Sequence, residues 1–181
     1  MTDLGRWRWV VVATTMWASL AAGAQAGDAD PCAAFSWDVG HERALFAGTP
    51  EAITAGASVD SAPLLASERL YRLTLVPEDH VAFAVAPERK RAASAADAGL
   101  ARLHIAAAGT YRVALSDRFW IDIVQGGKVI SSSGFTGSHG CNAPHKVVAY
   151  TLAAGDYVLQ ISGLSAADVE ISLTAAPTPA H

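Results

Sequence analysis

The segment with the densest set of reactive side chains is Ser138-His139-Gly140-Cys141-Asn142-Ala143-Pro144-His145-Lys146. Imidazole and thiolate groups are good ligands for transition metals such as zinc and copper. A loop of this length can bring His139 and His145 together, with Cys141 between them in the chain. One hypothesis is therefore a transition-metal site built on these two histidines.

Cys141 has a competing use, because the chain contains one other cysteine, Cys32. An even number of cysteines in an exported protein favours a disulfide, since thiols rarely stay reduced outside the cytoplasm. A Cys32–Cys141 bond leaves the two loop histidines without a third ligand. No spacing places the remaining candidate donors beside them, namely His80, His104 and Asp122. We expect the disulfide and no cofactor, and we keep a bound transition metal as the alternative.

Other catalytic motifs are incomplete. The run Thr136-Gly137-Ser138-His139-Gly140 narrowly misses the nucleophile motif G-x-S-x-G and lacks its strand-to-helix context. Gly126-Gly127-Lys128 lacks the hydroxyl residue and the upstream glycine of a phosphate-binding loop. A two-histidine, one-carboxylate iron site from His139, His145 and Asp122 lacks the spacing expected of ligands on neighbouring strands. We assign no catalytic residue and favour a protein that is not an enzyme.

Trp120 and Asp122 form a second candidate site, a ligand patch. They alternate with Phe119 and Ile121 along an expected strand, so the two pairs face opposite ways. If Phe119 and Ile121 point into the core, Trp120 and Asp122 point outward and can bind a sugar or another small ligand. The alternative is that Trp120 packs under a loop or a second layer, because large aromatic side chains dominate core burial.

Residues 1–26 have the pattern of a secretory signal peptide: basic Arg6 and Arg8, an apolar run from Trp9, and the cleavage motif Ala24-Gln25-Ala26. The strongly apolar stretch is about a dozen residues, short of the ~20 that span a membrane. Without residues 1–26 the chain carries 11 Lys and Arg against 16 Asp and Glu. Such an acidic balance argues against nucleic acid as a partner. We expect a soluble periplasmic or secreted protein, with no membrane span after cleavage.

Large apolar residues alternate with polar ones along most of the mature chain, the pattern of half-buried strands. We expect a first strand at 35–39, and further strands at 71–75, 81–85, 103–105, 111–115, 119–123, 148–152, 157–161 and 169–173, with Val129-Ile130 leading from a hairpin turn into a loop. A short helical turn at 41–46 is the most helix that the pattern allows. About eight to nine short strands predict an all-β protein, an antiparallel, jelly-roll-like β-sandwich.

A length of 181 residues suits one domain. We expect residues 27–67 to supply a strand and a loop that join the sandwich core at 68–174. Segments 47–67 and 131–139 are rich in small residues and indicate loops, and residues 175–181 contain two prolines and indicate a disordered tail.

Two stretches of the chain are similar to each other. Ala107-Ala108-Gly109-Thr110-Tyr111 and Ala153-Ala154-Gly155-Asp156-Tyr157 each place a glycine turn two residues before a tyrosine that starts a strand. Such a tyrosine can cover the edge of the core while its hydroxyl reaches backbone or water. We interpret the pair as two similar hairpin exits rather than a propeller repeat.

Several pieces carry a family resemblance: Leu70–Leu75 followed by Val81–Val85, the Ala-Gly-Thr-Tyr entry at 108–111, Trp120-Ile121-Asp122-Ile123 before a Gly-Gly turn, and Leu152–Leu159. In this order they resemble the bacterial pre-peptidase C-terminal type of β-sandwich. The start Phe35-Ser36-Trp37-Asp38-Val39 and the segment 140–146 are similar to small exported proteobacterial proteins of unknown function. The resemblance implies a non-catalytic accessory or binding module and transfers no catalytic residue.

These observations together predict an exported, non-enzymatic binding or accessory module of the cell envelope, whose partner is an envelope protein or a small ligand. The alternative is a small metal-binding protein or metalloenzyme that uses His139 and His145.

Overall fold

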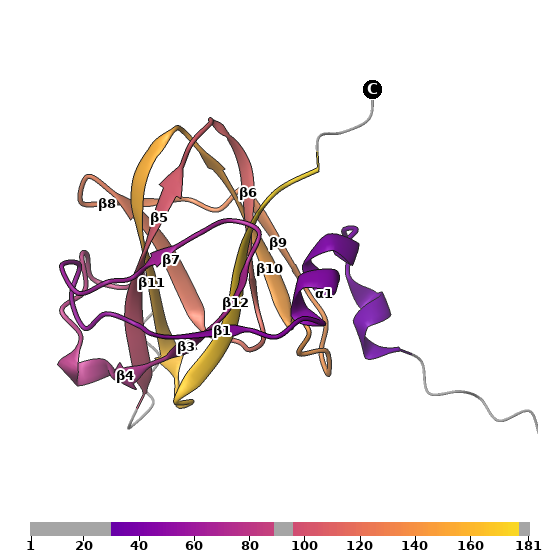
Figure 1. The fold of residues 1–181 in the computed structure, drawn as a ribbon, viewed down its shortest axis with the longest axis horizontal. Helices are drawn as coiled ribbons and strands as arrows, with labels where there is room; N and C mark the ends of the chain where they lie inside the picture. The colour runs from indigo at the N-terminus through magenta and orange to yellow at the C-terminus, as the bar shows by residue number, and fades with distance from the viewer. Residues whose placement is uncertain (1–29, 89–95, 178–181) are drawn as a thin grey trace, which may run out of the picture.

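The computed structural model describes residues 30–88 and 96–177, which form two β-sheets packed face to face (Figure 1). Sheet A contains, in spatial order, β1 (Glu51–Thr54), β3 (Leu70–Thr74), β12 (Asp168–Ala175), β6 (Gly109–Leu115), β10 (Lys146–Leu152) and β9 (Gly134–Gly137). Sheet B contains β2 (Leu64–Leu65), β5 (Asp97–Ile105), β11 (Gly155–Leu164), β7 (Trp120–Gln125) and β8 (Lys128–Ile130), with β4 (Val76–Pro77) also paired to β5. The prediction of an all-β sandwich is confirmed.

The core lies between the two sheets and follows directly from the alternation in the sequence. On β6, for example, Val113 and Leu115 point inward, and on β11 Leu159 and Ile161 face them. Each such fully buried aliphatic side chain contributes about 1.5–3 kcal/mol relative to an exposed one. The period-two pattern therefore fixes both the strands and the face that each strand buries.

The short strands β1 and β2 correct the expectation of a plain loop at 47–67. β1 pairs with β3, and β2 pairs with β5, both in parallel register within a sandwich whose other strand pairs are antiparallel among the described residues. A third short strand, β9, lies inside the segment 131–139 that was also expected to be a loop. These strands are short and mostly exposed, so they carry little apolar alternation.

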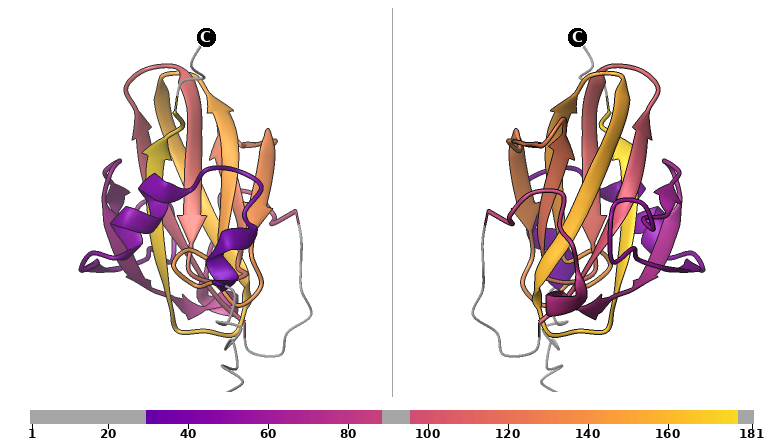
Figure 2. Two further views of the ribbon diagram at one scale, coloured as in Figure 1. Left: turned by 90° about the vertical axis from the view of Figure 1, so that its right-hand side faces the viewer. Right: turned by 90° about the vertical axis from the view of Figure 1, so that its left-hand side faces the viewer.

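The predicted first strand at 35–39 is wrong. The chain begins there with the 3-10 helix η1 (Pro31–Ala34) and reaches α1 (Gly40–Phe46) through irregular backbone. Phe35 and Trp37 alternate because they pack with Phe46 of α1 on the outer face of sheet A. The left-hand view of Figure 2 shows α1 lying across that face. The helical turn expected at 41–46 is confirmed as α1.

The predicted strand at 81–85 is also wrong, although its alternation is real. The preceding chain forms the 3-10 helix η2 (Glu78–His80), and no ladder follows it. Instead, the side-chain amide of buried Gln160 on β11 accepts from the N–H of Val85 (3.1 Å) and donates to its carbonyl (3.2 Å). A side chain thus satisfies the backbone groups that a neighbouring strand would otherwise bind.

The similarity between the two tyrosine turns has a structural basis. The Tyr111 hydroxyl donates to the Ala107 carbonyl (2.9 Å), and the Tyr157 hydroxyl donates to the Ala153 carbonyl (3.0 Å). Each tyrosine therefore bonds the residue four positions upstream and closes the turn that leads into its strand, as in the tyrosine corners of other sandwiches.

Two further predictions fall outside the described residues: the signal peptide at 1–26, and the last four positions of the tail expected at 175–181. β12 extends to Ala175, so the tail begins later than expected. Within the described part of the chain, no helix is long and apolar enough to cross a membrane.

Candidate functional site

A disulfide joins η1 to the loop between β9 and β10. Cys32 and Cys141 are bonded across a sequence separation of 109 residues, and Cys141 is buried. The predicted pairing is confirmed. A disulfide of this kind indicates an oxidising, extracytoplasmic environment. It also removes Cys141 from any set of metal ligands.

Further bonds hold the backbone of the same loop. The N–H of Ser138 donates to the carbonyl of His145 (3.1 Å), the N–H of Cys141 donates to the carbonyl of Ser138 (3.3 Å), and the Ser138 hydroxyl donates to the carbonyl of Pro31. Gly140 has a φ of +85°, a left-handed conformation that favours glycine. The loop that carries the two histidines is therefore tied to the N-terminal segment at two points.

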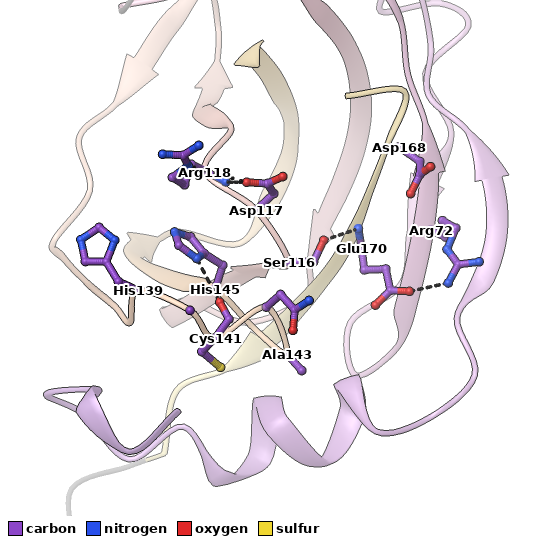
Figure 3. Close-up of a pocket in the computed structure, with 12 residues that line it drawn as sticks. Arg72, Ser116, Asp117, Arg118, His139, Cys141, Ala143, His145, Asp168 and Glu170 are labelled. Atoms are coloured by element: carbon purple, nitrogen blue, oxygen red, sulfur yellow. Dashed lines mark hydrogen bonds and ion pairs between the residues drawn. The ribbon is translucent and has the colours of Figure 1, made fainter. Parts of the chain in front are cut away.

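The structure brings His139 and His145 together, as the sequence predicts. Their ring centroids are 6.3 Å apart, with 76° between the ring planes. The ring of His145 is oriented by a hydrogen bond from Nδ1 to the Cys141 carbonyl (3.0 Å). Figure 3 shows both rings rising from the loop toward the same pocket.

The other candidate donors lie elsewhere. His80 is in η2 beside Asp79, His104 on β5 contacts Asp156 on β11 (2.7 Å), and Asp122 is buried on β7. Within residues 30–88 and 96–177, no group of three or more histidine, cysteine, aspartate or glutamate side chains could hold a metal ion. The described residues thus offer two histidines at one point.

The two histidines line a wide polar pocket of about 750 Å³ at one end of the sandwich. In its lining, Arg72 donates to Glu170 (2.6 Å), and Nε of Arg118 lies 3.9 Å from Oδ1 of Asp117. The hydrogen bond and the charge of Glu170 raise the pKa of Arg72 above its ordinary value. Because these charged groups are paired and mixed in sign, the pocket has no uniform field that would select an anion or a cation.

A second pocket, of about 420 Å³, opens at the edge of the sandwich where β7 faces β10; we call it the edge pocket. β8 pairs with residues 123–125 of β7, and within residues 30–88 and 96–177 no strand pairs with the beginning of β7 on that side. Two side chains of β10 bond the carbonyl groups that a neighbouring strand would otherwise bind. Lys146 donates to the Phe119 carbonyl, and the Tyr150 hydroxyl donates to the Ile121 carbonyl (3.4 Å).

Trp120 and Asp122 both line the edge pocket, but their roles differ. Phe119 and Ile121 are buried in the core and Trp120 is half-buried on the opposite face, so the predicted alternation is confirmed. Asp122 is not open to solvent. It accepts from the Trp120 indole N–H (2.6 Å) and from the backbone N–H of Glu88 (3.3 Å). Asp122 therefore orients the indole.

Apart from Trp120 and Asp122, the lining of the edge pocket was not expected from the sequence; it includes Phe135, Lys146 and Tyr150. Phe135 is 73% exposed and lies on β9, where it pairs with Val148 of β10. Burial, reinforced by the charges of Asp122 and Glu88, raises the pKa of Tyr150 above its ordinary value. No local signal could reveal these residues as part of one pocket with Trp120, because strand pairing joins β9 to β10 and the fold places β10 beside β7.

No protein-family model matches the chain, and no curated protein matches it. The resemblance to pre-peptidase C-terminal sandwiches and to small exported proteins therefore stays a prediction.

Proposed function

We propose that this protein is a periplasmic or secreted, non-enzymatic binding module of the cell envelope, and that the edge pocket is its ligand site. One observation carries the proposal: Phe135, 73% exposed, and the half-buried Trp120 both line the edge pocket. Small-molecule pockets are lined mainly by hydrophobic and aromatic side chains, together with a few polar groups that orient the ligand. The disulfide between Cys32 and Cys141 supports a site of action outside the cytoplasm.

The lining of the edge pocket suits a small ligand with one flat apolar face and several polar groups. Its volume lies within the roughly 300–1,000 Å³ that ligand pockets occupy. Trp120 and Phe135 provide aromatic surface, while Lys146 and Arg118, which also line the pocket, carry charged donor groups. A sugar ring has this combination of a C–H face and hydroxyl groups, so glycans are the first ligands to test.

The test begins with a glycan array and continues with calorimetric titration of any glycan that binds. Phe135→Ala is the decisive variant, because an exposed side chain can be removed without opening the core. We expect it to weaken binding at least tenfold. Leu64→Ala is the matched control: Leu64 is also a large exposed apolar residue (55%), but it lies on β2 and does not line the edge pocket.

Equal affinities for Phe135→Ala and the unmodified protein would contradict the assignment of the edge pocket. A metal-dependent turnover that is abolished by His139→Ala or His145→Ala would contradict the non-enzymatic function and favour the metalloenzyme alternative.

A further inference from the structure

We propose that His139 and His145 form a second binding site, independent of the edge pocket, for a divalent late transition metal. Copper(II) is the ion expected to bind most tightly. The site lies on the loop that the Cys32–Cys141 disulfide ties to η1; His139 is near the end of β9, and His145 directly precedes β10. The proposal rests on the tautomer of His145, the separation of the two rings and the fixed backbone between them.

The hydrogen bond of His145 determines which of its nitrogens can bind a metal. A backbone carbonyl can only accept, so Nδ1 of His145 must carry the proton that is shared with the Cys141 carbonyl at 3.0 Å. In the neutral imidazole, Nε2 then has its lone pair available. Metal-binding histidines commonly donate their second ring N–H to a carbonyl or carboxylate in this way, which fixes the ring and raises its basicity.

The distance between the rings permits one ion to bind both. With metal–nitrogen bonds of about 2.1 Å, two imidazoles that share an ion have centroids at most about 6.4 Å apart. The observed separation is 6.3 Å. The ring of His139 is exposed, so it can turn about its side-chain torsions toward His145. The backbone on either side need not move, because Ser138 and Cys141 are held by hydrogen bonds and the disulfide.

The donor set selects the class of metal. Two neutral imidazoles favour late first-row ions, and affinity rises along that row to a maximum at copper(II). Calcium and magnesium prefer oxygen ligands and are not expected to bind. Because no third protein ligand joins the histidines among the described residues, water or a ligand from solution completes the coordination. The surrounding pocket does not repel a cation, since Arg118 faces Asp117 and Arg72 is bonded to Glu170.

The experiment titrates the metal-free, untagged protein with copper(II) chloride in the presence of glycine as a weak competitor. Calorimetry gives the affinity, and electron paramagnetic resonance reports nitrogen ligands through their hyperfine splitting. We expect one copper(II) per chain with two imidazole nitrogens. His139→Ala and His145→Ala should each weaken binding at least tenfold, and the double variant should lose the nitrogen signal.

His104→Ala is the control. Like His139, His104 is an exposed histidine, but it lies on β5, where it contacts Asp156, and it does not belong to the proposed site. It should bind copper(II) as the unmodified protein does. The proposal is overturned if the unmodified protein binds no copper(II), if the double variant keeps the signal, or if His104→Ala weakens binding as much as His139→Ala. Because His139 is exposed, we expect His139→Ala to fold normally. A thermal melt like that of the unmodified protein then assigns any loss of copper(II) binding to the missing imidazole.

Discussion

Arg112 on β6 donates to the carboxylate of Glu42 on α1 at 3.3 Å, and both side chains are largely removed from solvent, with 14% and 1% exposed. Arg112 also donates to the Asp38 carbonyl (2.9 Å), and the Thr174 hydroxyl donates to Glu42 (3.1 Å). The guanidinium lies over the ring of Trp37, 5.4 Å from its centroid. This ion pair fixes α1 on the outer face of sheet A.

Removal of one partner of this pair should be costly, because the other stays buried without its counter-charge. We expect Glu42→Ala to lower the free energy of unfolding by about 3–5 kcal/mol. Glu42→Gln keeps an acceptor for Thr174 and Arg112, so it should cost less. Urea denaturation measures both values. Glu51→Ala is the control, because Glu51 pairs with Arg69 on the surface and should cost less than about 1 kcal/mol. Similar losses for Glu42→Ala and Glu51→Ala would show that the buried pair does not hold α1.

The disulfide should contribute a large share of the stability. It closes a loop of 109 residues in the unfolded chain, which the chain-entropy argument values at about 4–5 kcal/mol. Replacement of Cys32 and Cys141 by alanine should therefore lower the free energy of unfolding by an amount of that order. Thiol titration of the denatured, unreduced protein should find none, and two reactive thiols would contradict the pairing.

The hydroxyl groups of Tyr111 and Tyr157 should contribute differently to the free energy of unfolding. Tyr157 is buried, so Tyr157→Phe leaves the Ala153 carbonyl without its hydrogen-bond donor. We expect the free energy of unfolding to fall by about 1 kcal/mol. Tyr111→Phe should cost less, because Tyr111 is only half-buried and water can replace its hydroxyl. Chemical denaturation of the two variants under one condition gives the comparison. A larger loss for Tyr111→Phe would be the opposite of this expectation.

Tyr150 should make the protein sensitive to high pH. Its pKa is raised in the folded state, first by burial and then by the charges of Asp122 and Glu88. In the unfolded chain the phenol ionises near pH 10, at about its ordinary pKa. The unfolded state therefore releases a proton that the folded state keeps, so stability is lost as the pH rises above about 10. The loss should be about 1.4 kcal/mol per pH unit.

Ultraviolet absorbance of phenolate against pH measures this effect, together with denaturation at each pH. Tyr150→Phe should flatten the decline in stability at high pH. An unchanged decline in Tyr150→Phe would assign the sensitivity to another group.

The sequence predicts the long strands well, because their apolar alternation is also the cause of their burial. It fails where alternation has another cause. At 35–39 alternate side chains pack on the outer face of a sheet, and at 81–85 they accompany a backbone that bonds the Gln160 amide. The sequence also fails to predict β1 and β2. These strands are short and mostly exposed, and they are recognised by their parallel pairing with β3 and β5 rather than by an apolar pattern of their own.

The candidate sites divide in the same way. His139 and His145 are six positions apart on one loop, so their approach is a local property that the sequence can indicate. Trp120 and Asp122 alternate on one strand and are also found from the sequence. Phe135 and Tyr150 join them only through the pairing of β9 with β10 and through the contact of β10 with β7, and a single sequence does not encode such pairings locally.

An uncovered strand edge invites another chain to add to the sheet, which is a common origin of aggregation. At the beginning of β7 the carbonyls of Phe119 and Ile121 are already bound by Lys146 and Tyr150. An incoming strand would have to displace both donors, and it would meet the charge of Lys146 as it did so. The side chains that shape the edge pocket thus also occupy the backbone acceptors that a strand of a second copy would need in order to pair there.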